Sequence, residues 1–376
     1  MKINFIKLLY EEENDMKKNK GITLVALVVT IVVLLILAGV SINLVLGNNG
    51  IIAKAKDAET KSAEASQNDL KGMNGLVSEM EGALAGNGST GNGNTGSGNN
   101  FVTKNTEVTY PDGKVWIPEG FKVAGDSAST VQGGVVIEDK DGNQFVWVPV
   151  DTISDYKRTW YTGSDGITFG SYSETLKDDE KTSVTTYKGF YIGRYEAGDK
   201  ESTVAKTLRS SNDVTKTVTI KANQAPYNYV TRTQAKSLAE GVKTQQGYKA
   251  KTKLVSSYAW DTTIAFIQKV NSDYGSSSGE ENYYNKTFSY TDITGASQTK
   301  SSNSPVLVPT GQTTPVCNIY DMGGNVFEWT TEFCSDSPSA GRGGDYGYYT
   351  NYPAGYRVTL SDSATDNYGF RLTLFM

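Results

Sequence analysis

Asn318-Ile-Tyr-Asp-Met-Gly-Gly-Asn-Val-Phe-Glu-Trp329 is the most informative stretch of this 376-residue chain. It lies in the aromatic part of the sequence: of 40 aromatic residues, only Phe5 and Tyr10 fall among the first 100 positions. This distribution indicates that two different kinds of protein are joined. The 276 residues from Phe101 onward are enough to bury a full core as one large domain.

The sequence contains no histidine, which excludes a Ser-His-Asp triad, a Cys-His dyad and a metal site built on imidazole. Its two cysteines permit at most one disulfide and cannot form a four-cysteine zinc site. The net charge of −5, from 36 basic and 41 acidic side chains, gives no indication of a nucleic-acid partner.

A long apolar segment near the N-terminus predicts a membrane helix. No charged residue occurs between Lys20 and Lys54, and the 25 residues Ile22–Leu46 are mostly aliphatic. As a helix they would be about 38 Å long, enough to cross a hydrocarbon core of about 30 Å. Lysines precede this segment, so we expect the N-terminus in the cytoplasm and the rest exported to the cell surface.

The basic stretch Met16-Lys-Lys-Asn-Lys-Gly21, followed by Ile22-Thr-Leu-Val-Ala-Leu, resembles a type IV prepilin. In that family a membrane peptidase cuts after the glycine, so the resemblance implies a leader over 1–21, with Met16 as an alternative start, and processing between Gly21 and Ile22. Prepilins usually carry glutamate at the fifth mature position, where this chain has Ala26. That departure argues against a major filament subunit. The alternative interpretation is an uncleaved signal anchor.

Two further segments separate the membrane helix from the aromatic domain. Within 47–85, apolar residues at 70, 73, 77, 80 and 84 form one stripe of a predicted stalk helix. Residues 86–100 contain only Gly, Asn, Ser and Thr, which predicts a flexible linker with a reach of about 21 Å. We expect the domain over 101–376 to be displayed from this linker.

The pattern from Phe101 onward predicts an α+β domain with much irregular structure. The expected elements are a hairpin over 134–149 with its turn at Asp141-Gly142, a strand over 190–195, helices over 233–242 and 257–270, and a surface loop over 276–304. In the second helix, Trp260, Ile264 and Ile267 share one side, which indicates a core position.

Residues 318–329 are very similar to the GLYDMAGNVWEW signature of the formylglycine-generating enzyme family, the sulfatase-modifying-factor type of C-type-lectin-like fold. Further landmarks of the family follow in its order. Residues 145–149 resemble its VPGG strand, 189–196 its F-x-I-x-x-x-E strand, 342–344 its RGG and 369–371 its closing GFR. The match covers roughly residues 115–374 and implies a C-type-lectin-like fold for 101–376.

The resemblance does not imply that this chain is catalytic. Oxidising members of the family bind copper through two cysteines after the RGG, and iron-dependent relatives use three histidines. This chain has no cysteine between Arg342 and Arg371, and Cys317 and Cys334 match neither position. We therefore expect no enzyme activity of this type and no copper or iron. The two cysteines form either one disulfide or two buried thiols.

The signature loop implies a calcium site by the same resemblance. The family's ligands map to the side chains of Asp321 and Glu328 and to the carbonyls of Gly324 and Val326, and such oxygens suit Ca²⁺. The alternative interpretation is that the two carboxylates accept hydrogen bonds within turns.

Residues 342–368 are dense in Tyr, Gly, Asn, Ser and Asp, the composition of evolved binding surfaces. We therefore predict a contact surface that is similar in composition to the variable proteins of diversity-generating retroelements. The alternative is that several tyrosines, Tyr368 among them, belong to an aromatic core. The predicted contact residues are Arg342, Asp345, Tyr346, Tyr348, Tyr349, Asn351, Tyr352, Tyr356, Asp366 and Asn367.

These expectations together predict a membrane- or pilus-anchored binding protein, a minor pilin or adhesin, with a non-catalytic head. Its expected partners are an extracellular protein or glycan, the membrane and other pilins, with no nucleic acid. Two other functions stay open: an exported sulfatase-modifying enzyme of the formylglycine-generating type, and a structural pilus subunit.

Overall fold

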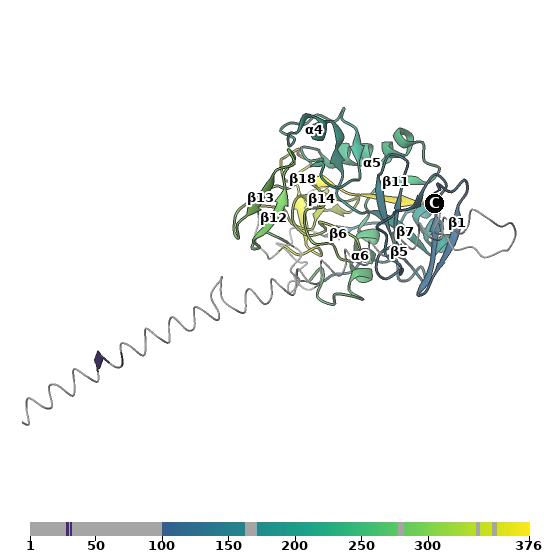
Figure 1. Ribbon diagram of the computed structural model, residues 1–376. Coiled ribbons are helices and arrows are strands. Elements are labelled where there is room, and N and C mark those ends of the chain that lie inside the picture. The colour runs from purple at the N-terminus through teal and green to yellow at the C-terminus, as the bar shows by residue number, and fades with distance from the viewer. Residues whose placement is uncertain are drawn as a thin grey trace, which may run out of the picture. The chain divides into compact units, whose positions relative to one another are not determined.

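The computed structural model of the protein describes Val28, Val29, Ile31 and residues 100–161, 171–276, 282–335, 339–347 and 352–376 (Figure 1). The chain separates into two units, Met1–Thr90 and Gly91–Met376. The predicted leader, with Gly21 and Ile22, the membrane helix, the stalk and the linker otherwise lie outside the described residues. Within the described ranges, no helix is both long and apolar enough to cross a membrane.

The described part of the second unit is mixed α+β, with more residues in strands than in helices. Its largest sheet has six antiparallel strands in the order β11-β19-β7-β5-β4-β3. The last strand of the chain, β19, lies between β11 and β7. The six are β3 (Lys122–Val123), β4 (Val136–Glu138), β5 (Gln144–Pro149), β7 (Gly189–Gly193), β11 (Lys251–Leu254) and β19 (Leu372–Phe375).

Both faces of this sheet are buried, because successive side chains of its strands enter two different apolar clusters. In β5, Phe145 and Trp147 join one cluster, while Val146 and Val148 join the other. Helix α5 (Arg232–Gln246) contributes to the first cluster, and α3 (Asp178–Tyr187) and α6 (Ser257–Ile267) to the second. The sheet is therefore covered by helices on both sides.

The predicted hairpin, strand and two helices are present with shifted ends: the strand expected over 190–195 is β7, the helix expected over 233–242 extends to Gln246, and the helix expected over 257–270 ends at Ile267. Strands β4 and β5 form the expected hairpin, and Gly142 takes the left-handed conformation (φ 81°) at its turn. Helix α5 begins with a capping box in which Thr231 and Gln234 each accept from the other's backbone N–H. In α6, Trp260, Ile264 and Ile267 are buried, as their spacing indicates.

A second sheet holds the informative stretch. Its order is β17-β16-β14-β18, with β14 parallel to β18 and the other pairs antiparallel. Trp329 of β14 lies beside Phe370 of β18, so the two most recognisable motifs of the sequence are adjacent strands. The strands are β14 (Phe327–Trp329), β16 (Ser339–Arg342), β17 (Arg357–Leu360) and β18 (Tyr368–Phe370).

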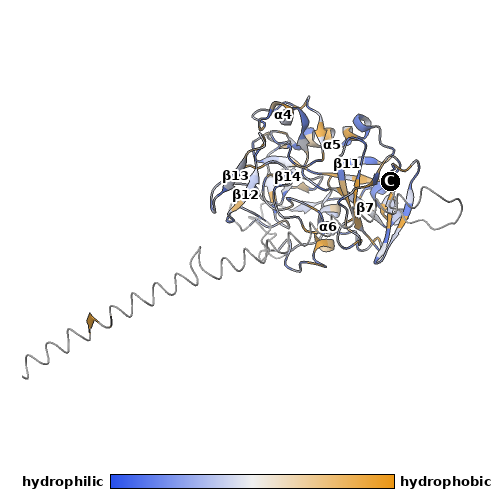
Figure 2. Cartoon of the chain, viewed as in Figure 1, coloured by the Kyte–Doolittle hydropathy of each residue, from blue (hydrophilic) through white to orange (hydrophobic). Residues whose placement is uncertain are grey.

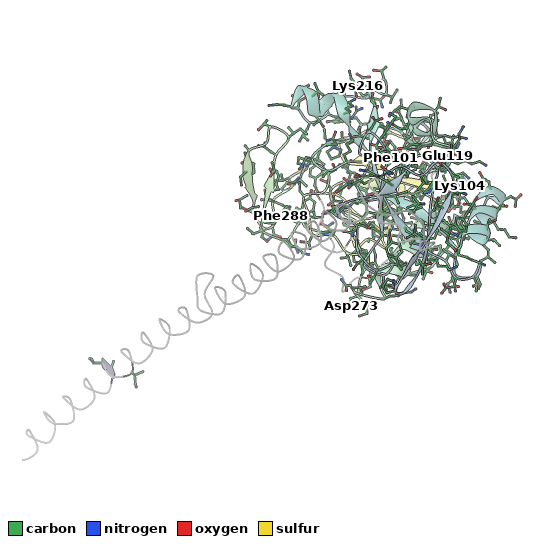
Figure 3. The ribbon with its side chains drawn as sticks, turned by 45° about the vertical axis from the view of Figure 1, so that its right-hand side comes forward. Phe101, Lys104, Glu119, Lys216, Asp273 and Phe288 are labelled. Carbon is green, nitrogen blue, oxygen red and sulfur yellow. The ribbon has the colours of Figure 1, made fainter. Side chains whose placement is uncertain are left out.

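Smaller elements complete the described structure. Val102 N–H donates to the Phe121 carbonyl, and Glu119 N–H to Asn105 Oδ1, so Phe101, Lys104 and Glu119 lie together (Figure 3). The remaining elements are β1 (Thr106–Tyr110), β2 (Gly113–Ile117), β6 (Tyr172–Ser173), β8 (Gly198–Asp199), α4 (Lys200–Ala205), β9 (Val218–Thr219), β10 (Ala225–Pro226), β12 (Phe288–Thr291), β13 (Ser297–Lys300) and β15 (Phe333–Cys334).

The expectation of an irregular loop over 276–304 is wrong for its second half, where β12 and β13 form an antiparallel hairpin. Asp292 fixes the turn, because its carboxylate accepts from the N–H groups of Thr294 and Ala296. Strand β13 is hydrophilic along most of its length, so no apolar alternation marks it in the sequence (Figure 2).

Candidate functional site

The signature stretch folds around one fully buried amide, that of Asn325. Its Nδ2 donates to Glu196 Oε2 at 2.7 Å and to the Val308 carbonyl at 3.1 Å. Its Oδ1 accepts from Tyr283 Oη at 3.0 Å and from Val308 N–H at 3.1 Å. Asn325 also has a left-handed backbone (φ 58°), which asparagine tolerates better than most residues. This side chain therefore locks the turn that leads into β14.

Glu328 pairs with the arginine of the closing motif. Arg371 Nε lies 3.1 and 3.0 Å from the two carboxylate oxygens of Glu328, and its Nη2 lies 2.7 Å from Oε1. Arg371 also donates to the carbonyls of Gly193 and Tyr320. Burial raises the pKa of Glu328 to about 7 against the opposing effect of Arg371. This buried pair joins β7, β14 and the last strands of the chain.

Asp321 and Glu196 complete a group of buried carboxylates around Arg371. Asp321 accepts from Gly311 N–H at 2.9 Å and from Thr313 Oγ1 at 2.5 Å, and burial raises its pKa. Burial, and then repulsion by Asp321 and Glu328, hold the pKa of Glu196 well above its usual range. Sequence reasoning missed Glu196 as a site residue, although it ends the quoted strand motif.

The carboxylates of the two acidic residues predicted to bind calcium already accept hydrogen bonds from protein donors. Asp321 accepts from a backbone and a hydroxyl group, and Glu328 from a guanidinium, which fits the alternative of hydrogen-bond acceptors in turns. Gly324 takes a left-handed conformation (φ 93°), and Val326 N–H lies 3.3 Å from Glu196 Oε1. Among the described residues, no group of three or more acidic or cysteine side chains is arranged to hold a metal ion. Calcium binding stays a prediction.

A second buried ion network lies at the base of the tyrosine-rich segment. Arg342 and Arg357 are opposite each other in the β16–β17 pair. Asp261 of α6 reaches both, with Oδ1 at 2.5 Å from Arg342 Nη2 and Oδ2 at 2.5 Å from Arg357 Nη2. Glu332 pairs with Arg357 at 3.1 Å and also with Arg158. We call Asp261, Glu332, Arg342 and Arg357 the arginine clamp.

The clamp corrects one expectation and reveals residues that the sequence did not indicate. Arg342 is fully buried and therefore cannot form part of a contact surface; it fixes one end of the segment 343–356, and Arg357 fixes the other. The one available signal was Asp261, an acidic residue inside the apolar helix pattern of α6. An unpaired carboxylate would be costly there, so its position indicated a buried cationic partner.

The tyrosines divide into core and surface. Tyr356 is buried and is likewise corrected from contact residue to core. Its ring lies 4.2 Å from that of half-buried Tyr352, and both pack near Phe327. Tyr368 packs edge-to-face against Trp329 at 5.0 Å, which confirms the alternative of an aromatic core for these three tyrosines.

A polar layer remains at the surface above this core. Tyr346 is partly exposed, and its hydroxyl donates to Asp366 Oδ2 at 2.7 Å; Asp366 is exposed. Beneath them, buried Asp345 accepts from the Asn367 amide, so Asp345 is also corrected from contact residue to support. We call Tyr346, Asp366 and Asn367 the tyrosine surface. The other predicted contact residues, Tyr348, Tyr349 and Asn351, lie outside the described residues.

The two cysteines are both buried thiols, which decides between the two alternatives. Cys317 lies near Gln132, and its carbonyl would be 2.0 Å from any Cβ placed on Gly134. Cys334 is in β15, with its sulfur 3.1 Å from Thr359 Oγ1. Burial raises the pKa of the Cys317 thiol to about 11, so the reactive thiolate is disfavoured.

Comparisons with known proteins add little to this geometry. No family model matches the chain, and no curated protein does. A solved structure titled "Crystal Structure of CarF" aligns with 55% of this chain and 96% of that chain, at 14% identity and a TM-score of 0.34. A similarity this low carries no argument about function.

Proposed function

We propose that the protein is a surface-displayed binding protein with a non-catalytic, C-type-lectin-like head, and that the tyrosine surface is its contact region. The observation that carries the proposal is partly exposed Tyr346, hydrogen-bonded to exposed Asp366, in a segment whose ends are held by the buried ion pairs of the arginine clamp. A tyrosine ring offers a large contact area at low entropic cost when its surroundings are fixed.

The arginine clamp supports this proposal because it fixes both ends of the segment 343–356, and Arg342 also donates to the Tyr356 carbonyl at 3.1 Å. Arg342 and Arg357 are held by the same carboxylate, so residues 343–356 begin and end at one point of the scaffold. Binding surfaces work well on rigid supports of this kind. Tyr348, Tyr349 and Asn351 belong to the same segment and are proposed to extend the contact region.

The family part of the proposal rests on the resemblance of 318–329 and 369–371. It is supported by the pairing of Glu328 with Arg371, which ties the two motifs together. Display rests on the prepilin-like N-terminus, with cleavage proposed after Gly21. N-terminal sequencing of the mature protein tests this, and a start other than Ile22 would remove the pilin part.

Binding is tested with the full chain against arrays of glycans and of extracellular proteins. The test variant is Tyr346→Ser with Asp366→Ser, and the control is Lys236→Ser with Glu240→Ser, an exposed pair on α5. The proposal expects ligands that the wild type and the control retain and the test variant loses. Cysteine oxidation of a sulfatase peptide by the protein would instead establish the enzyme alternative.

A further inference from the structure

The β12–β13 hairpin has an edge that no other described strand covers. Figure 1 shows the hairpin at the margin of the second unit. Among the described residues, its two strands pair only with each other. A ribbon of two strands is marginally stable on its own, and further strands stabilise it. The outer edges of the hairpin are therefore the positions at which another strand would be expected to pair.

The turn of the hairpin determines which backbone groups point outward. Asp292 N–H donates to the Ala296 carbonyl at 2.9 Å, so these two residues form a hydrogen-bonded pair. Such pairs alternate with non-hydrogen-bonded pairs along an antiparallel ladder. By this alternation, two pairs of the hairpin direct their N–H and C=O groups away from the partner strand. These pairs are Ser289–Thr299 and Thr291–Ser297.

The two edges of the hairpin differ in what they face. On the β12 edge, the outward N–H of Thr291 donates to Gln312 Oε1 at 2.8 Å, so another part of the domain lies against this edge. On the β13 edge, the outward N–H and C=O groups of Ser297 and Thr299 have no partner among the described residues, and both residues are exposed. Of the two edges, β13 is therefore the one that is open to another strand.

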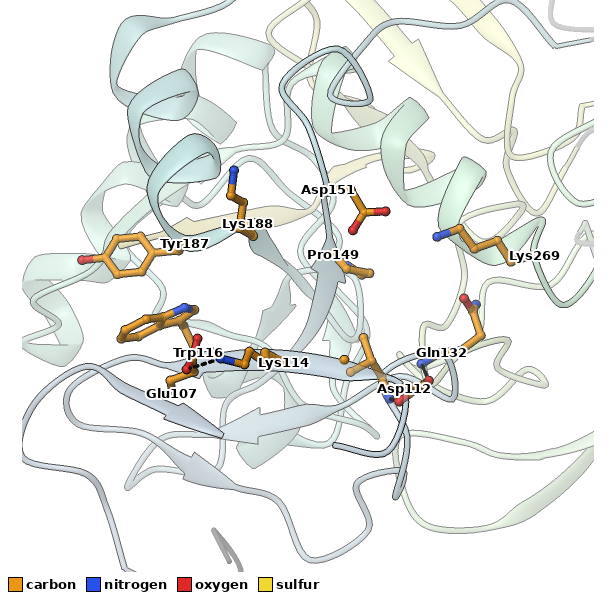
Figure 4. A pocket seen from close by; sticks show the side chains of 12 residues that line it. Glu107, Asp112, Lys114, Trp116, Gln132, Pro149, Asp151, Tyr187, Lys188 and Lys269 are labelled. Atoms are coloured by element: carbon orange, nitrogen blue, oxygen red, sulfur yellow. Dashed lines mark hydrogen bonds and ion pairs between the residues drawn. The ribbon is translucent and has the colours of Figure 1, made fainter. Parts of the chain in front are cut away.

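The β13 edge also lacks the charged side chains that usually protect exposed strands from pairing. The charged residue of β13, Lys300, is 1% exposed, and its ammonium donates to three main-chain carbonyl groups at 2.7, 2.9 and 3.1 Å. The β1–β2 hairpin is different, because it carries the charged pair of Lys114 and Glu107 (Figure 4). The remaining residues of β13 are Ser, Gln and Thr, so nothing in this strand repels an identical strand.

We propose that the β13 edge pairs with the β13 edge of a second copy of this chain, in an antiparallel arrangement with two-fold symmetry. Ser297 of each copy then lies opposite Thr299 of the other, and each of these pairs forms two N–H···O=C hydrogen bonds. Their hydroxyl side chains also face each other, which favours cross-strand pairing. The product is a four-stranded sheet with the order β12-β13-β13-β12.

A second copy fits this edge because the interface is self-complementary. Ser297 and Thr299 are two residues apart, so the symmetric register gives a partner to every outward N–H and C=O group of both strands. The two-fold axis closes the contact, which limits the assembly to a dimer. None of the residues in this interface belongs to the tyrosine surface, so the dimer does not depend on the function proposed above.

Gln298 provides a direct test, because it lies on the two-fold axis between the two hydrogen-bonded pairs. It faces Gln298 of the second copy as a non-hydrogen-bonded pair, with the Cα atoms about 4.5 Å apart. A disulfide can bridge this distance. The test variant is therefore Gln298→Cys, and the control is Ser289→Cys, which places a thiol at an exposed position of β12.

The experiment is oxidation of the full chain in lipid vesicles with copper phenanthroline, followed by a non-reducing gel. We expect Gln298→Cys to form a cross-linked dimer at least about tenfold faster than Ser289→Cys, because pairing holds the two thiols together. Cys317 and Cys334 are buried thiols, so the wild type should form no cross-link.

Proline substitutions separate strand pairing from exposure of the thiol. In the Gln298→Cys background, Thr299→Pro removes an outward N–H that the hairpin does not use, so cross-linking should slow to the rate of Ser289→Cys while the Tm is kept. Ser289→Pro makes the same change at the position opposite Thr299 and should leave the rate of Gln298→Cys unchanged. The proposal is overturned if Gln298→Cys cross-links no faster than Ser289→Cys, or if the two proline variants cross-link equally fast.

Discussion

Asp261→Asn is the substitution that tests the arginine clamp most sharply. It keeps the size of the side chain but removes the negative charge that lies 2.5 Å from both Arg342 and Arg357. The three side chains are at most 1% exposed, so water cannot replace the lost partner. Of the clamp's two carboxylates only Glu332 would remain, beside the buried guanidinium groups of Arg342 and Arg357.

Removing one partner of a buried ion pair costs about 3–5 kcal/mol, because the other charge stays buried without compensation. We expect a loss of this size in the free energy of unfolding, measured by urea denaturation at pH 7. The control is Glu240→Gln, which breaks the exposed Lys236–Glu240 pair of α5 and should cost less than about 0.5 kcal/mol. A loss below about 1 kcal/mol for Asp261→Asn would refute the clamp as a structural support.

Three further predictions concern titration, thiols and metal. Burial raises the pKa of Glu174 from 4.5 to about 7, so the folded state holds this proton more tightly than the unfolded state. The resulting gain in the free energy of unfolding is complete below about pH 4.5 and is lost as the pH rises through 7. Glu174→Gln should remove this pH dependence: relative to the wild type, its free energy of unfolding should be higher by up to about 3 kcal/mol at pH 8 and unchanged at pH 4. The same difference between variant and wild type at both pH values would contradict this prediction. The buried thiols of Cys317 and Cys334 should react with a thiol reagent at pH 8 only after denaturation, and rapid reaction of the native protein would contradict their burial. If calcium binds at Asp321 and Glu328, a chelator should lower the Tm of the protein. An unchanged Tm would contradict calcium binding and leave Arg371 as the partner of the Glu328 carboxylate.

The sequence predicted the elements whose signals are local. The hairpin of β4 and β5 is signalled by the Asp141-Gly142 turn and by the β-rich run of β5, which lie within a few residues of each other. The apolar side of α6 follows from the spacing of Trp260, Ile264 and Ile267 within that helix. For the same reason the α+β class could be predicted. The β12–β13 hairpin could not, because its turn is fixed by Asp292 hydrogen bonds rather than by an apolar pattern.

The candidate site was harder to predict because composition does not say which side of a strand a residue occupies. Arg342 and Tyr356 lie in a segment with the composition of a contact surface, yet both are buried. Their burial depends on Asp261 and Phe327, which lie elsewhere in the sequence. Tyr346 is partly exposed and Asp366 is exposed, and a hydrogen bond joins them although they lie 20 positions apart; their role as contact residues stays a prediction.

We propose that the tyrosine surface binds a ligand on a non-catalytic scaffold. The most direct test is the affinity of the full chain for a ligand found on the arrays, compared with Tyr346→Ser/Asp366→Ser and with Asn367→Ala. We predict at least tenfold weaker binding by the double variant, because it removes an aromatic anchor and its charged partner. We predict a smaller loss of affinity for Asn367→Ala, because Asn367 is next to Asp366 in the chain and is not part of the Tyr346–Asp366 pair. Equal affinity of the wild type and the double variant would show that the ligand binds elsewhere on the protein.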